Sequence, residues 1–144
     1  MTGARRAYLT GCWLLLLVAV AHTMGHLQPP PADAAYQALD AASRDYRTPM
    51  GFGMAPSVFD IQQALSLTMS VLTAGLALLG LVAGWRLAEP GRLRALAAVN
   101  LIVSAALAVG YFRHRIPPPL VSFVLTSVVF AVALLWPRPR PNRA

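Results

Sequence analysis

Three histidines are the residues of this sequence best suited to binding a ligand. His22 and His26 stand four positions apart in the segment AHTMGH, at the end of an apolar run, so one helical face would carry both imidazoles. A helix uses this spacing to offer two nitrogen ligands to one metal ion. His114 lies in the turn RHRI between two later apolar runs, where it would add a third imidazole. The pattern therefore allows a metal site formed by His22, His26 and His114.

The opposite interpretation gives these histidines a structural role at a helix end. No thiol or carboxylate stands beside the histidines within the apolar runs, and a metal-binding imidazole usually needs a carboxylate that orients it. A haem held by two histidines would suit positions deeper in a helical bundle. An imidazole facing hydrocarbon would lose its hydrogen bonds to water, so we expect His22 and His26 to face the protein interior in either case.

Charged residues add a second kind of chemistry. Arg113 and Arg115 flank His114, and Asp60 stands at the start of a long apolar run. Together with the histidines they suit an anionic ligand, such as a lipid headgroup or a quinone-like molecule. The alternative is structural, because the two arginines can pair with aspartates of the first loop. Asp60 can likewise form a capping box with Ser57 at a helix start.

The composition of the chain is that of a membrane protein, whose helices would position these residues. Apolar residues make up 57% of the chain, charged residues make up 12%, and the mean hydropathy is +0.57. A bilayer core about 30 Å thick needs about 20 apolar residues as helix. We therefore expect residues 1–144 to form a single all-α membrane domain, a four-transmembrane-helix up-and-down bundle. The expected spans are residues 8–27, 57–85, 92–112 and 118–136.

The arginines orient this bundle. With the N-terminus and C-terminus in the cytoplasm, eight arginines lie inside and four lie outside, as the positive-inside rule requires. The inner ones are Arg5, Arg6, Arg86, Arg92, Arg94, Arg138, Arg140 and Arg143, and the outer ones are Arg44, Arg47, Arg113 and Arg115. Because the arginines lie beside apolar runs, the net charge of +7 reports topology and does not indicate a nucleic-acid partner. The expected partner is the lipid bilayer.

A cleaved signal peptide over residues 1–34 is the rival interpretation of the first apolar run. Arg5 and Arg6 precede an apolar core, and the ADA segment at residues 32–34 resembles a cleavage site. However, thirteen residues of polar and proline-rich chain run from His22 to Ala34, whereas cleavage normally occurs close to the core. We therefore expect a membrane span.

The outer loop between the first two spans predicts a short amphipathic helix over residues 33–48. Asp33 is a suitable N-cap, and one stripe of the helix is apolar, formed by Tyr36, Leu39, Ala42 and Tyr46. We expect this helix to lie along the outer membrane surface or to cover the bundle. The segment TPMGFGMAP then interrupts the helix, and we expect three of its side chains to plug the outer end of the bundle: Met50, Phe52 and Met54.

Small and polar residues inside the spans predict how the helices pack. Gly80 and Gly84 form a small-xxx-small pair suited to close helix contact, with the alanine-rich third span as the expected partner. Asn100 is the only amide deep within the spans, because Gln62 and Gln63 stand near the interface, and at its depth it needs a hydrogen-bond partner.

Three segments of the chain resemble a family of small uncharacterised bacterial four-helix membrane proteins. They are AHTMGHLQPP, SVFDIQQALSLTMS and YFRHRIPPPLVSF, separated by a polar helix and a glycine-rich span. The family motif His-x-x-Gly-His matches His22, Gly25 and His26, and an aromatic pair before prolines matches Tyr111, Phe112, Pro117 and Pro118. The turn RHRI and the QQA segment depart from the family pattern, so the likeness is to the family and not to a member. The resemblance implies an integral protein of the bacterial cytoplasmic (inner) membrane and implies no activity.

The sequence contains no nucleophile with a base, no pair of catalytic acids and no cofactor motif, and its one cysteine, Cys12, allows no intramolecular disulfide. We therefore expect a non-enzymatic accessory or assembly partner without a cofactor, which binds another membrane protein or a second copy of itself. The alternative is a ligand-binding or redox membrane module. Its outer-face histidine site would take a metal, a haem, or a quinone-like or anionic lipid ligand.

Overall fold

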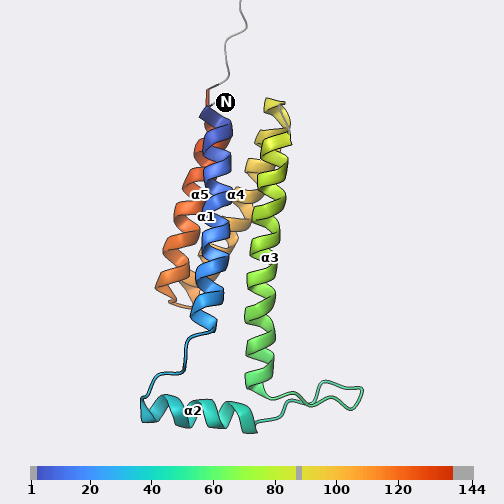
Figure 1. Ribbon diagram of the computed structural model, residues 1–144, viewed down its shortest axis with the longest axis vertical. Coiled ribbons are helices and arrows are strands. Elements are labelled where there is room, and N and C mark those ends of the chain that lie inside the picture. Colours follow the sequence, from blue (N-terminus) through green and yellow to red (C-terminus); the bar gives the residue numbers. More distant parts are fainter. Residues whose placement is uncertain (1–2, 87–88, 138–144) are drawn as a thin grey trace, which may run out of the picture. The chain divides into compact units, whose positions relative to one another are not determined.

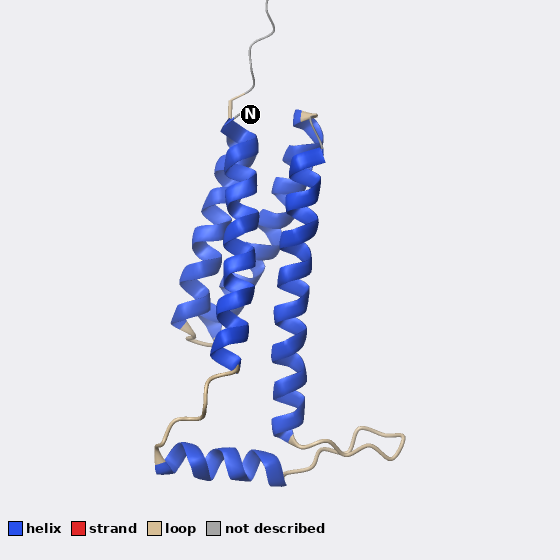
Figure 2. Ribbon diagram, viewed as in Figure 1, coloured by secondary structure: helices blue, strands red, loops and turns tan. Residues whose placement is uncertain are grey.

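The computed structural model describes residues 3–86 and 89–137 and shows an all-α protein (Figure 1). Five helices are joined by loops, and these residues form no strand (Figure 2). The helices are α1 (Gly3–His26), α2 (Ala34–Asp45), α3 (Val58–Arg86), α4 (Pro90–Arg113) and α5 (Pro117–Leu135). All except α2 are long and apolar enough to cross a membrane. The expectation of four long apolar helices and one short helix is confirmed.

Residues before the first turns explain where two of the helices begin. Asp33 accepts hydrogen bonds from the backbone N–H groups of Ala35 and Tyr36, which confirms it as the N-cap of α2. Before α3, the backbone N–H of Asp60 donates to the Ser57 hydroxyl at 3.0 Å, and the Ser57 N–H donates to the Asp60 carboxylate at 3.0 Å. The predicted capping box is therefore present.

Two helix bounds differ from the expected ones by more than two residues. Helix α1 begins at Gly3 rather than at residue 8, because Arg5 and Arg6 are good helix formers and extend the helix beyond its apolar part. Helix α2 ends at Asp45 rather than at residue 48, because Tyr46 has an extended backbone (φ −71°, ψ 115°) and leads into a hairpin.

The chain divides into two compact units. The bundle unit contains the first part of α1 and the second part of α3, up to residue 18 and from residue 73, with α4 and α5. The loop unit is residues 19–72, which hold the end of α1, all of α2 and the start of α3. The expectation of a single membrane domain stays a prediction.

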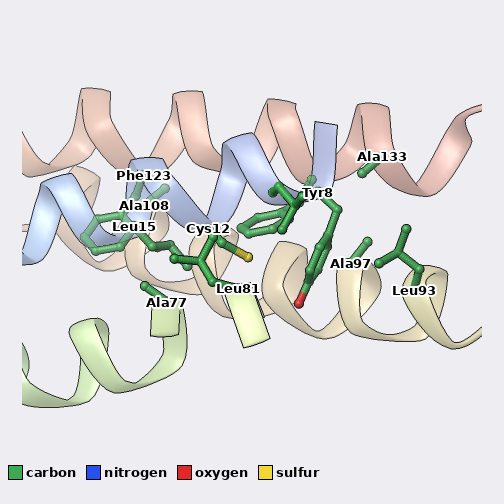
Figure 3. Packing of buried hydrophobic residues seen from close by; sticks show 12 residues of the cluster. Tyr8, Cys12, Leu15, Ala77, Leu81, Leu93, Ala97, Ala108, Phe123 and Ala133 are labelled. Atoms are coloured by element: carbon green, nitrogen blue, oxygen red, sulfur yellow. The ribbon is translucent and has the colours of Figure 1, made fainter. Parts of the chain in front are cut away.

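All four helices of the bundle unit contribute to one apolar core (Figure 3). Tyr8 is fully buried, and its ring lies 5.8 Å from that of Phe130 between centroids. Tyr111 stacks on Phe123 at 5.6 Å and joins α4 to α5. The buried cluster consists of Tyr8, Leu9, Cys12, Leu15, Ala77, Leu81, Leu93, Ala97, Ala108, Phe123, Phe130 and Ala133.

Glycines allow α1 to approach its neighbours closely in the bundle unit. A Cβ atom added at Gly80 would lie 2.6 Å from the Cys12 Sγ, and one added at Gly84 would lie 2.7 Å from a methyl carbon of Leu9. The predicted small-xxx-small contact therefore exists. Its partner is α1 and not the alanine-rich α4, because the nearest atoms to both glycines belong to α1.

Arginine side chains bind the carbonyl groups that are left without partners where two helices end. Arg5 on α1 donates from Nε to the Gly84 carbonyl and from a terminal nitrogen to the Trp85 carbonyl, both at 2.8 Å. Arg94 on α4 donates to the carbonyl of Trp136, the C-cap of α5. A cation at a helix C-terminus satisfies these acceptors and complements the helix dipole. Arg5 and Arg94 therefore have a structural role in the bundle unit, in addition to their contribution to the positive charge.

The contact at Gly80 predicts a large difference between two glycines of α3. The change Gly80→Ala should lower the free energy of unfolding by about 1–3 kcal/mol, because the short Cys12 side chain cannot move out of the way. The matched control Gly75→Ala meets no atom within 4 Å and should be neutral or stabilising by up to about 1 kcal/mol. Thermal unfolding of both variants in detergent, followed by circular dichroism, measures the difference. Equal melting temperatures would contradict the close contact.

Candidate functional site in the loop unit

His22 connects two helices of the loop unit. Its Nε2 atom lies 3.0 Å from the Ser66 hydroxyl oxygen, so a hydrogen bond joins α1 to α3. The imidazole is half-buried. The prediction that His22 faces the protein is therefore confirmed, and Ser66 is the partner that the sequence alone did not identify. The i, i+4 spacing indicated which face of α1 is polar but not which residue of α3 lies opposite.

His26 is the last residue of α1, as expected from the end of the apolar run. Its side chain is half-buried. An imidazole at a helix C-terminus complements the negative end of the helix dipole.

Asp60 belongs to a group of charged and aromatic side chains around the start of α3. Besides the capping box, its carboxylate lies 3.7 Å from a guanidinium nitrogen of Arg47. The guanidinium carbon of Arg44 lies 3.6 Å from the centre of the Phe59 ring, and Arg44 also pairs with Asp40 at 2.8 Å. Both members of the Arg47–Asp60 pair are more than half exposed, so the pair adds little stability. These contacts attach α2 and the hairpin to α3.

Arg113, His114 and Arg115 lie at the end of α4 in the bundle unit, and all three side chains are exposed. Arg115 has a left-handed backbone (φ 55°), its N–H donates to the Phe112 carbonyl, and the next N–H, from Ile116, donates to the Tyr111 carbonyl. These two bonds form a Schellman motif, in which glycine usually occupies the left-handed position. This turn could not be predicted from the sequence, because an arginine stands at the position that glycine usually takes.

The predicted sites are not assembled within either unit. His22, His26 and Asp60 belong to the loop unit, whereas Arg113, His114 and Arg115 belong to the bundle unit. Over residues 3–86 and 89–137, no group of three or more His, Cys, Asp or Glu side chains lies close enough to hold a metal ion. The three-histidine site and the anion site beside Arg113 and Arg115 stay predictions. Asp40 and Asp60 pair instead with arginines of their own unit.

A second buried polar group occurs in the core of the bundle unit. The Asn100 amide nitrogen donates to the Tyr8 hydroxyl at 3.5 Å, and both residues are almost fully buried. Asn100 therefore has the partner that its depth required. Ser104, one turn further along α4, is fully buried, and its hydroxyl has no hydrogen-bond partner among the described residues. The role of Tyr8 as the partner of Asn100 could not be predicted from the sequence, because an aromatic residue at the end of an apolar run is equally suited to a membrane interface.

Comparison with known proteins adds no assignment: no family model, curated protein or solved structure matches this chain. The resemblance to the four-helix family therefore stays a prediction. Of the candidate residues, the geometry gives structural partners to His22 and to Asp60.

The His22–Ser66 bond predicts unequal effects at two serines of α3. The change Ser66→Ala should lower the free energy of unfolding by about 0.6–2 kcal/mol, because it leaves a half-buried imidazole without its partner. The matched control Ser70→Ala should have an effect near zero, because the buried Ser70 hydroxyl makes no hydrogen bond to the described residues. Unfolding in detergent measures both. A Ser66 variant as stable as the Ser70 variant would contradict the role of this bond.

Proposed function

We propose that this chain is an integral protein of the bacterial cytoplasmic membrane, a four-transmembrane-helix bundle that acts as a non-enzymatic accessory or assembly partner. The observation that carries the proposal is the apolar outward face of the long helices. Leu79 on α3 is 72% exposed and Ile102 on α4 is 68% exposed, while Ala77 beside Leu79 is fully buried. Exposed leucine and isoleucine in such number suit lipid and not water.

The bundle unit also supports an orientation with both ends in the cytoplasm. Arg5 and Arg94 lie at the end of the bundle unit where α3 and α5 finish, and Arg86 and Arg92 stand beside the same connection of α3 to α4. The positive-inside rule favours this end as the cytoplasmic one. In a four-span topology, the connection between α1 and α3 would then be expected on the outer side of the membrane.

The contacts of the charged residues support a role without catalysis. Asp60 caps α3 and pairs with Arg47, Asp40 pairs with Arg44, and His22 bonds to Ser66. Each of these groups therefore has a structural function. The apolar stripe of α2 is exposed, with Leu39 at 67%, so the loop unit offers a surface to a lipid bilayer, to another membrane protein or to a second copy.

Cysteine accessibility tests the topology. On a Cys12→Ala background, a cysteine at Asp45 should react with a membrane-impermeant maleimide added outside intact cells. A cysteine at Glu89 should react only after the cells are permeabilised, because the α3–α4 connection is expected in the cytoplasm. The reverse pattern would overturn the orientation, and equal labelling of both positions would overturn the four-span bundle.

The second candidate function is a ligand-binding or redox module, which the half-buried His22 between α1 and α3 favours. Metal analysis and a visible absorption spectrum of the purified protein in detergent separate the two functions. The accessory function predicts a colourless protein without stoichiometric metal. One metal or haem per chain that is lost in His22→Ala and retained in the control Ser70→Ala would instead establish the second candidate.

A further inference from the structure

Residues 47–57 of the loop unit form a short hairpin between α2 and α3, which is held by isolated bridges and not by regular strands. Bridges pair Arg47 with Ser57 and Gly51 with Met54. Backbone N–H groups donate from Met50 to the Met54 carbonyl at 3.0 Å and from Met54 to the Gly51 carbonyl at 2.9 Å. The turn of this hairpin is therefore closed by its own hydrogen bonds.

The turn places an aromatic residue where the backbone disfavours it. Its two central residues, Phe52 and Gly53, have positive φ angles of 49° and 74°. This is the type I′ arrangement, for which Asn-Gly is the preferred pair and in which a bulky residue is strained. The Phe52 side chain is 100% exposed, so it neither stabilises the turn nor packs on the protein. The predicted plug at the end of the bundle is therefore wrong for Phe52.

The tip of the hairpin is apolar and its base is charged. Twelve consecutive residues from Thr48 to Phe59 carry no charge. Met50 and Met54 are both more than half exposed on either side of Phe52. Below them, Arg47 and Asp60 form an exposed ion pair. The hairpin thus changes from charged to apolar along its length, which is the polarity gradient of a lipid interface.

The direction of the hairpin fits the plane of a membrane that α3 crosses. Within the loop unit, α2 runs crosswise to α3, and the hairpin extends sideways from the first turn of α3 (Figure 2). Helix α3 has 29 residues and is about 44 Å long, so its first turns reach the headgroup region of a bilayer. A hairpin attached to these turns would therefore lie at the depth of the headgroups.

We propose that the hairpin of residues 47–57 is an interfacial anchor, whose tip of Met50, Phe52 and Met54 inserts into the headgroup region of the bilayer. This inference rests on the proposed function. The internal hydrogen bonds of the turn reduce the cost of moving backbone groups out of water. The exposed guanidinium of Arg47 at the base is complementary to lipid phosphates. A lipid surface accounts for both the apolar tip and the charged base, where Arg47 is exposed beside Asp60.

Environment-sensitive fluorescence tests this inference in the full chain, reconstituted into phosphatidylcholine vesicles on a Cys12→Ala background. A nitrobenzoxadiazole label is attached to a cysteine at Met54, at Gln37 on the polar side of α2, or at Leu79 on the outward face of α3. Quenching is measured with lipids that carry a nitroxide near the headgroup and with aqueous iodide. The label at Leu79 reports whether α3 lies in the bilayer at all, which separates failure of this inference from failure of the proposed function.

The label at position 54 should emit at shorter wavelength than the label at position 37 and should be quenched by the nitroxide lipid, with little effect of iodide. Phe52→Asn should lower the ratio of inserted to free hairpin about tenfold while keeping the turn, because Asn-Gly suits type I′ geometry. Phe52→Trp is the matched control and should retain insertion.

Three results would overturn the inference. In the first, the label at position 54 is quenched by iodide as strongly as that at position 37, while the label at position 79 is quenched by the nitroxide lipid. In the second, protection of position 54 depends on the protein-to-lipid ratio, which would indicate a second copy of the chain as the occupant. In the third, position 79 is not quenched by lipid, which would remove the proposed function together with the anchor.

Discussion

The structure depends on the contrast between a small apolar interior and a large apolar exterior. Fully buried residues of the bundle unit are few and include several alanines, while many leucines, valines and isoleucines point outward from the same helices. In water, the exposed side chain of Leu79 on α3 would be unfavourable, whereas the burial of Ala77 in the core is favourable. In the proposed membrane location, lipid would make both faces favourable. The helices would then need close packing and satisfied polar groups to associate, since burial from water would no longer drive them together.

The contacts between helices meet that requirement. Gly80 and Gly84 bring the backbone of α3 against Tyr8, Leu9 and Cys12 of α1, which increases van der Waals contact where apolar burial contributes little. Hydrogen bonds are added where the helices meet, between Asn100 and Tyr8 and between His22 and Ser66. Arg5 and Arg94 bind carbonyls that would lack partners at the ends of α3 and α5. The capping box likewise gives hydrogen-bond partners to backbone N–H groups at the start of α3.

Features set by local chemistry were predictable from the sequence, and features set by tertiary contact were not. The four apolar helices follow from the length of the apolar runs, and Asp33, Ser57 and Asp60 follow from capping preferences. The partner of the glycine pair was wrong, because neither spacing nor composition says which helix lies opposite. A turn over TPMGFGMAP was predicted, but its paired hairpin form was missed because Phe52 occupies a position that normally takes asparagine or glycine. The Schellman motif was missed because Arg115 stands where glycine is usual. The histidine site shows the same limit: spacing identified the polar face of α1, and Ser66 as partner emerged only from the structure.

Spin-label accessibility along α3 in lipid vesicles tests most directly whether the exposed apolar faces of these helices contact lipid. Labels at Leu72 and Leu79, which are 65% and 72% exposed, should collide freely with oxygen and hardly at all with a water-soluble nickel chelate. A label at the buried Leu81 should be shielded from both reagents, so that accessibility to oxygen follows the helical period. Free access of the nickel chelate to Leu79 would show that α3 faces water, and would contradict the account.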